Sequence, residues 1–237
     1  DSRKGRSSGV YSYLSQKKEN TVQMKLVYLD TSTSFMVIGL YEISSEVSTV
    51  DILKKNAPRD AGQNLVPLTG QLLEKNGWEK PDLISAALGP GSFTGIRTAV
   101  SAARDFSQVW KIPLFGFDTL EVYCRYFSEK FSTDIVALLD GKMKKAFAGS
   151  VIQGIYSGTK DIPPENLEAE FKMTENMKIA TDMNLPVSHV SLYDDFPDAS
   201  AVLRHRREEL LSFPREPNYE KVFPVYLRTT YAEGKFI

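Results

Sequence analysis

The chain has 237 residues, of which 42% are hydrophobic and 25% are charged, as in ordinary soluble globular proteins. Its formal net charge of −1 excludes a strong overall field that would draw it onto nucleic acid or an anionic membrane. Cys124 is the only cysteine, which excludes an internal disulfide and a thiolate metal cluster and fits a reducing, cytoplasmic location. Because Tyr and Phe surround it, we expect a buried packing residue rather than a nucleophile. No apolar run approaches the roughly 18–20 residues that span a bilayer.

Residues 1–23 differ from the rest of the chain. They carry five Lys or Arg against two acids, several Ser and Gly, and no continuous apolar core of the kind that signal peptides have. We interpret them as a flexible N-terminal extension or an expression remnant, and we expect the folded domain to begin at Met24.

Residues 24–122 predict the first of two α/β halves. Three short apolar runs with tight connections, 25–30, 35–43 and 46–53, predict an antiparallel meander. The helical spacing of Leu65, Leu68 and Leu72 predicts a helix over 62–76. Further elements are expected in the order strand 82–88, helix 95–110, strand 113–117 and a helix capped by Asp118.

Residues 123–237 predict a second, reduced half. The run 135–140 is apolar and ends in Asp140, as 25–30 ends in Asp30, and a returning strand is predicted over 146–153. Beyond it, the pattern is broken by the prolines at positions 163, 164, 186, 197, 214 and 217, and one helix is predicted over 199–211. Two strand–Asp–turn–strand openings indicate a duplicated α/β unit.

The stretch GPGSFTGIR, residues 89–97, places three glycines between a predicted strand and a predicted helix. No Lys-Ser/Thr pair follows at Walker A spacing, and the glycine spacing is one residue longer than the dinucleotide fingerprint. Two interpretations remain: the backbone N–H groups bind an anion, or the loop is a tight turn with Ser92 or Thr94 capping the helix.

A catalytic set is missing from the sequence. The two histidines, His189 and His205, lack metal-ligand spacing, so we predict no catalytic residue and no metal site. Asp30 and Asp140 stand at strand ends, where a magnesium–phosphate site could form, although acidic residues also commonly cap such turns.

Four motifs occur in a fixed order and resemble the TsaB family, also called YeaZ. They are YLDTSTS (28–34), GPGSFTGIR (89–97), LLDGKMKKAF (138–147) and PVYLR (224–228). The resemblance covers residues 24 to about 153 well and implies the actin/hexokinase/Hsp70-like (ASKHA) fold, with two related α/β halves. Active relatives bind the ATP phosphates with the turn after the first strand and with the hairpin that opens the second half. The candidates for a vestigial nucleotide site in this chain are therefore Asp30, Thr31, Ser32 and Asp140.

The resemblance implies a non-catalytic subunit of the tRNA threonylcarbamoyladenosine complex. Such a subunit binds a TsaD-like catalytic subunit, meets a TsaE-like ATPase through the complex, contacts tRNA indirectly and forms a homodimer when alone. No cofactor is expected to bind tightly, and ATP or ADP is expected only in the complex. The alternative is an independent ATP-using enzyme of the sugar-kinase type, for which no general base or adenosine-binding Gly-Gly motif is found.

This sequence departs from the family in two stretches. Ala61 stands where many members keep a histidine, and the turn 141–145 carries Lys142, Lys144 and Lys145. The first change removes support for a metal-dependent peptidase. The lysines either attract an anion or form a solvated turn.

One face of the predicted 95–110 helix carries mostly small residues: Thr98, Ser101, Ala102 and Asp105. A small face lets a second helix approach near the lower end of the roughly 8–10 Å range of axis separations, although a plain exposed face tolerates small residues too. Since the family builds its dimer contacts from its first two helices, we predict the interface here, with the glycine loop turning the chain into it.

Overall fold

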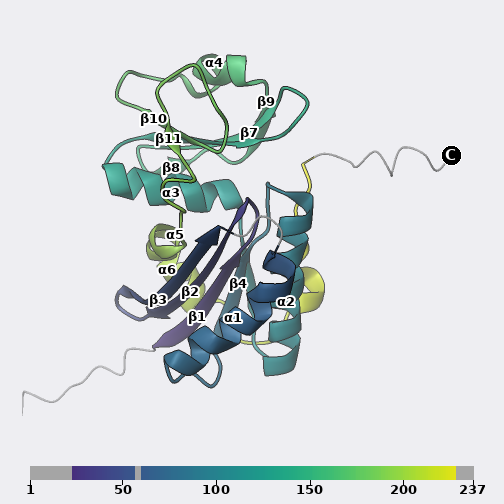
Figure 1. Cartoon of the computed structure of the whole chain (residues 1–237). Coiled ribbons are helices and arrows are strands. Elements are labelled where there is room, and N and C mark those ends of the chain that lie inside the picture. The colour runs from purple at the N-terminus through teal and green to yellow at the C-terminus, as the bar shows by residue number, and fades with distance from the viewer. Residues whose placement is uncertain (1–22, 57–59, 228–237) are drawn as a thin grey trace, which may run out of the picture.

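The computed structural model describes residues 23–56 and 60–227, which form two β-sheets with helices on their faces (Figure 1). The expectation of a flexible extension at residues 1–23 falls almost entirely outside the described residues. The described part begins with the first strand of the first sheet, whose opening residue is Met24.

The first sheet has five strands in the order β3-β2-β1-β4-β5. They are β1 (Met24–Asp30), β2 (Phe35–Ile43), β3 (Val47–Asn56), β4 (Leu83–Ala87) and β5 (Leu114–Phe117). Strands β1, β2 and β3 pair antiparallel, while β1, β4 and β5 run parallel. The predicted meander is therefore confirmed, and the two helical crossovers that follow explain the parallel strands.

Both faces of this sheet are covered, and β1 shows it residue by residue. Val27 and Leu29 belong to the core under α1 (Ala61–Lys75) and α2 (Phe93–Trp110), whereas Leu26 and Tyr28 belong to the core under α3 (Thr119–Phe131). Because neighbouring side chains of a strand point to opposite faces, a nearly continuous apolar run is what a strand buried on both sides requires.

The second sheet has the order β11-β10-β6-β7-β8, with β9 also paired to β7. Its strands are β6 (Ile135–Asp140), β7 (Ala146–Ile152), β8 (Ile155–Tyr156), β9 (Lys160–Ile162), β10 (Lys178–Thr181) and β11 (Val190–Ser191). One face packs on α3, and the short α4 (Leu167–Phe171), which follows the 3-10 turn Pro164–Asn166, covers the other.

The two halves share one topology. In each sheet the central strand pairs antiparallel with the strand that follows it and parallel with a later strand: β1 with β2 and β4, β6 with β7 and β10. The second copy is smaller, since β8, β9 and β11 have two or three residues each. This confirms the predicted α/β fold of two related halves, the second one reduced.

The single helix predicted over 199–211 was wrong: it is divided into α5 (Ser200–His205) and α6 (Arg207–Ser212) at Arg206, whose guanidinium donates to the buried Glu121 carboxylate at 2.8 Å. The proposed boundary between residues 122 and 123 falls inside α3, which contributes to the core of both sheets. Among the described residues, no helix is long and apolar enough to cross a membrane.

Cys124 lies in α3 and is fully buried, as expected of a packing residue. Burial raises the pKa of its thiol, because the thiolate would lose its hydration. A neutral, inaccessible thiol is a poor nucleophile. The interpretation of Cys124 as a small core residue is confirmed.

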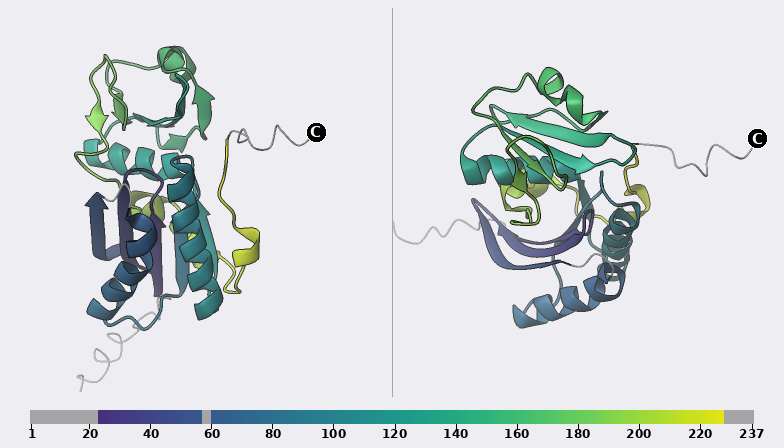
Figure 2. Two further views of the ribbon diagram at one scale, coloured as in Figure 1. Left: turned by 45° about the vertical axis from the view of Figure 1, so that its right-hand side comes forward. Right: turned by 45° about the horizontal axis from the view of Figure 1, so that its top comes forward.

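The chain after α6 runs back along the first half, where Figure 2 shows it beside α2. Asn218 extends the free edge of β5, since its side-chain amide accepts from Leu114 N at 2.7 Å and donates to Leu114 O at 3.0 Å. The turn Tyr219–Lys221 follows, and Val225 N then donates to Leu88 O at 2.8 Å. The described part of the PVYLR motif is thereby fixed next to the glycine loop.

Candidate functional site

The glycine loop packs on the turn that follows β1. A Cβ atom added at Gly95 would lie 1.8 Å from the carbonyl oxygen of Thr31, and one at Gly91 would lie 2.3 Å from that of Ser32. Two hydrogen bonds join the same segments: Ser92 N donates to Ser32 O at 2.6 Å, and the Thr31 hydroxyl donates to Gly95 O at 2.6 Å. The glycines are needed because two stretches of this chain's own backbone touch.

This contact bears on the two interpretations of the loop, an anion-binding loop and a tight turn that caps the helix. The helix-capping interpretation is confirmed for Ser92, whose hydroxyl accepts from Gly95 N at 3.4 Å, and α2 begins at Phe93, two residues earlier than predicted. Thr94, the other cap candidate, lies inside α2, where its carbonyl accepts from the Thr98 hydroxyl at 2.9 Å, so Ser92 is the cap. The neighbour that requires close approach is thus the 31–32 turn.

Asp30 is held inside the protein by hydrogen-bond donors. Its carboxylate accepts from Ser32 N at 2.8 Å, from the Ser32 hydroxyl at 2.6 Å, and from the hydroxyls of Tyr28 and Tyr123 at 3.1 Å each. Burial raises the pKa of Asp30, against the lowering effect of these donors. Asp30, Thr31 and Ser32 are each at most 1% exposed. Their side chains therefore stabilise the turn from within.

A cleft of about 660 Å³ separates the two halves above this turn. It is lined by residues of the 32–34 turn, the glycine loop and the β6–β7 turn, together with Asp182 and Tyr193. Of the four nucleotide-site candidates, Ser32 and Asp140 line the cleft, whereas Asp30 and Thr31 do not. The structure therefore brings together only part of the predicted set.

On the side of the cleft that the second half forms, the charged side chains contact groups of the same half. The Asp140 carboxylate accepts from Lys142 N at 2.8 Å and forms an ion pair with the Lys142 ammonium, which lowers the pKa of Asp140. Asp182 accepts from Asp140 N at 2.9 Å, and burial raises the pKa of Asp182. The sequence reasoning missed Asp182, although it follows directly on the strand β10. Among the described residues, no three His, Cys, Asp or Glu side chains are grouped so that they could hold a metal ion.

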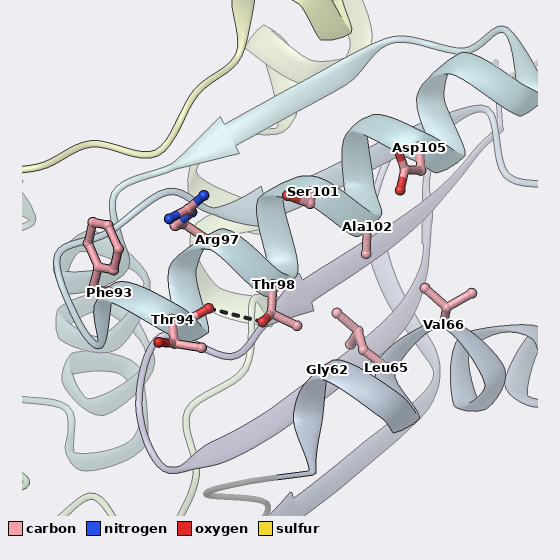
Figure 3. Close-up of a pocket in the computed structure, with 10 residues that line it drawn as sticks. All are labelled: Gly62, Leu65, Val66, Phe93, Thr94, Arg97, Thr98, Ser101, Ala102 and Asp105. Atoms are coloured by element: carbon pink, nitrogen blue, oxygen red, sulfur yellow. Dashed lines mark hydrogen bonds between the residues drawn. The ribbon is translucent and has the colours of Figure 1, made fainter.

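A second hollow, of about 410 Å³, lies between α1 and α2 and is drawn in Figure 3. We call it the α1–α2 groove. It is lined by Gly62, Leu65, Val66, Phe93, Thr94, Arg97, Thr98, Ser101, Ala102 and Asp105. All four predicted interface residues belong to this set, and two large apolar side chains stand exposed at its rim, Val66 at 46% and Phe93 at 45%.

The four interface candidates are not equally accessible. Ser101 and Asp105 are exposed and Thr98 is half-buried, but Ala102 is only 6% exposed and belongs to the core cluster that contains Leu65. The placement of Ala102 on an outward face was therefore wrong, because α1 packs across that side of α2. Ala102 forms the floor of the groove.

The comparisons with known proteins agree with this architecture. Residues 47–190, more than half of the 237, match the family described as "TsaD: tRNA N6-adenosine threonylcarbamoyltransferase". The chain belongs to this family. Similar curated proteins include several named TsaB as well as tRNA N6-adenosine threonylcarbamoyltransferases, and the TsaB/YeaZ resemblance that the four motifs predicted is confirmed.

Two curated relatives and one solved structure illustrate the similarity. The tRNA threonylcarbamoyladenosine biosynthesis protein TsaB of Escherichia coli is 25% identical over 127 residues, 52% of this chain and 53% of the relative, so the chain spans about half the length of that relative. TsaB of Buchnera aphidicola from Schizaphis graminum is 24% identical over 159 residues, 65% of this chain and 72% of the relative. YeaZ from Pseudomonas aeruginosa, at 20% identity, superposes with a TM-score of 0.68 over 86% of this chain and 100% of that one. The last similarity shows a shared fold.

We expect the isolated chain to bind ATP weakly. Asp30 and Thr31 are committed to internal hydrogen bonds, and Asp140 is paired with Lys142. A dissociation constant in the low micromolar range would need about 7–8 kcal/mol of well-placed contacts. Calorimetric titration of the purified chain with Mg-ATP is expected to give no saturable heat at micromolar concentrations; a low-micromolar constant that is lost in Asp140→Ala would contradict this.

Proposed function

We propose that this chain is a non-catalytic subunit in the biosynthesis of threonylcarbamoyladenosine in tRNA, and that it binds a TsaD-like catalytic subunit through the α1–α2 groove. The observation that carries the proposal is this groove: a hollow between two helices, with a floor of small residues and an exposed apolar rim, in a protein of the TsaD family. Exposed apolar side chains beside a concave surface are typical of protein-binding sites.

The other partners follow from the same role. With a net charge of −1, the chain offers no overall attraction to tRNA, so tRNA contact is assigned to the assembled complex. A TsaE-like ATPase would meet this chain in that complex, and ATP or ADP would be held only there. When the catalytic subunit is absent, the same groove would bind a second copy of the chain.

The alternative function, an independent ATP-using enzyme of the sugar-kinase type, is favoured only by the cleft between the halves. Its inner turn is engaged in intramolecular hydrogen bonds, and its outer wall holds the Asp140–Lys142 pair. A kinase would need a general base near a bound hydroxyl. A non-catalytic role accounts for the hydrogen bonds of the inner turn and for the Asp140–Lys142 ion pair without further assumptions.

Reconstitution tests the proposal. With purified TsaD-like and TsaE-like subunits, ATP, threonylcarbamoyl donor and tRNA, we expect modification only when this chain is added, and none from the chain alone. Ser101→Arg places a long cation in the groove and is expected to lower partner capture and modification at least about tenfold, because its desolvation would be uncompensated.

Ser212→Arg is the matched control, since Ser212 is an exposed serine at the end of α6, a helix whose Leu210 packs in the core cluster on the other face of the first sheet. It is expected to behave as wild type. Equal modification with and without the chain would overturn the proposed role. Partner capture that survives Ser101→Arg would show that the groove is not the binding surface.

A further inference from the structure

The last described segment of the chain, residues 222–227, leaves large apolar side chains on the surface beside α2 (Figure 2). Phe223, Val225 and Tyr226 are 54%, 46% and 45% exposed. The segment is nevertheless fixed to the fold, because Val225 N donates to the Leu88 carbonyl. A contiguous group of exposed apolar side chains on a fixed backbone is typical of a binding surface.

Two arginines of α2 lie on the aromatic rings of this surface. The guanidinium carbon of Arg104 is 4.7 Å from the centroid of the Phe223 ring, and that of Arg97 is 5.2 Å from the centroid of the Phe93 ring. The Phe93 ring centroid is in turn 5.1 Å from that of Tyr226. Since the two arginines are seven residues apart, they share one side of the helix, roughly 10 Å apart along its axis. We call these five residues the aromatic–arginine strip.

The strip is positively charged. Within residues 23–56 and 60–227, neither arginine forms an ion pair or donates a side-chain hydrogen bond. Lys111, which caps α2, and Lys221, which precedes the exposed segment, are exposed as well. Over 93–111 and 219–227, these four cations are accompanied by two acids, Asp105 and Glu220. The strip therefore attracts anions, although the chain as a whole has a net charge of −1.

Resting on the proposed function, we propose that the aromatic–arginine strip binds an unpaired stretch of RNA, and that it is this chain's own direct contact with tRNA. Unpaired bases stack on exposed aromatic rings and on guanidinium planes, while cations bind the phosphates. The contacts with the rings hold the guanidinium groups in place before the RNA binds. An acidic protein segment would use the cations alone, whereas RNA uses the cations and the rings.

The strip lies at the edge of the α1–α2 groove, and this position allows the two surfaces to be tested separately. Phe93 and Arg97 also line the groove (Figure 3), whereas Arg104, Phe223 and Tyr226 are not among its lining residues. Changes at the latter three therefore address RNA binding without altering the surface proposed for the TsaD-like subunit.

Removing two charges outside the groove tests the proposal. The double variant Arg104→Gln/Lys221→Gln is compared with Lys144→Gln/Lys145→Gln, which removes the same charge from the exposed β6–β7 turn. Fluorescence anisotropy of the full chain with a labelled anticodon stem–loop RNA, at several salt concentrations, measures both. We expect the first variant to lower the affinity at least about tenfold and to reduce the salt slope by about 1.4, and the control to match wild type.

Phe223→Leu tests the stacking contribution. Leucine keeps an apolar side chain at this position but removes the ring. We expect the affinity for the stem–loop to fall at least about fivefold with an unchanged salt slope, because no phosphate contact is lost. Binding of a duplex RNA of the same length is expected to stay as in wild type, since its bases are not free to stack on a side chain.

Three results would overturn the proposal: no saturable stem–loop binding by wild type at low salt up to about 100 μM, equal losses in the two double variants, or equally tight binding of a polyglutamate peptide, which would indicate an acidic protein partner instead. Circular dichroism and capture of the TsaD-like subunit are expected to be unchanged in Arg104→Gln/Lys221→Gln, because neither residue lines the groove. Failure of RNA binding with intact capture would leave the proposed function standing, whereas tRNA modification without this chain would overturn that function.

Discussion

Replacing Gly95 with alanine is expected to lower the free energy of unfolding by about 3 kcal/mol or more, among the larger effects of single substitutions. The added Cβ would lie 1.8 Å from the Thr31 carbonyl oxygen, which is backbone and cannot swing aside. Relief requires separating the loop from the 31–32 turn, and this would stretch the hydrogen bonds that Thr31 and Ser92 make across the contact. Chemical denaturation followed by circular dichroism measures the change.

Gly70→Ala is the matched control. Gly70 is also helical, but a Cβ there meets nothing within 4 Å. Alanine in a helix is better than glycine by roughly 0.8–1 kcal/mol, so this variant is expected to be as stable as wild type or slightly more so. A Gly95→Ala protein that unfolds at the same denaturant midpoint as wild type would show that the glycine loop is not in close contact with the 31–32 turn.

The elements and their duplication could be predicted from local patterns. The helices over 62–76 and 95–110 were found to within two residues, because apolar spacing and the Ser92 cap are local signals. The match between Asp30 and Asp140 predicted the repeated topology for the same reason. What the glycines approach could not be predicted, since residues 31 and 95 are 64 positions apart and only the folded sheet brings them together.

Which side chains of a helix are buried also depends on distant parts of the chain. On the wheel of its own helix, Ala102 lies opposite the apolar stripe, yet α1 covers it. Likewise, Asp182 follows a four-residue strand in a region where the periodicity is weak, so no local signal pointed to the cleft. For the candidate site, the sequence predicted helices and turns that line the groove and the cleft, but not which of their side chains reach the surface.

Asp30→Ala is expected to reduce the free energy of unfolding by about 3 kcal/mol or more without removing any ligand-binding group. The substitution takes the acceptor from the Tyr28 hydroxyl and from Ser32 N, and each buried donor left without a partner costs about 1–3 kcal/mol. The Tyr123 hydroxyl keeps the Ser32 hydroxyl as a neighbour at 3.0 Å, which limits the loss.

The effect of Asp30→Ala should also depend on pH. The pKa of Asp30 is raised in the folded protein, so the folded state holds this proton more tightly than the unfolded state does. The contribution of Asp30 to stability is then full below the ordinary aspartate pKa and declines as the pH rises above about 4. The stability difference between wild type and Asp30→Ala is therefore expected to narrow from acidic towards neutral pH, as measured by denaturation at several pH values.

Asp140→Ala is the matched comparison for Asp30→Ala, because the two aspartates end equivalent strands of the two halves. The Asp140 side chain is 35% exposed and pairs with a surface lysine, so its removal is expected to cost at most about 1 kcal/mol. If the turns served a bound nucleotide, both substitutions would act mainly on binding and little on stability. A stable Asp30→Ala protein would contradict the structural role. A large loss for Asp30→Ala beside a small one for Asp140→Ala would instead mean that the first turn supports the glycine loop, and through it the α2 helix that lines the groove.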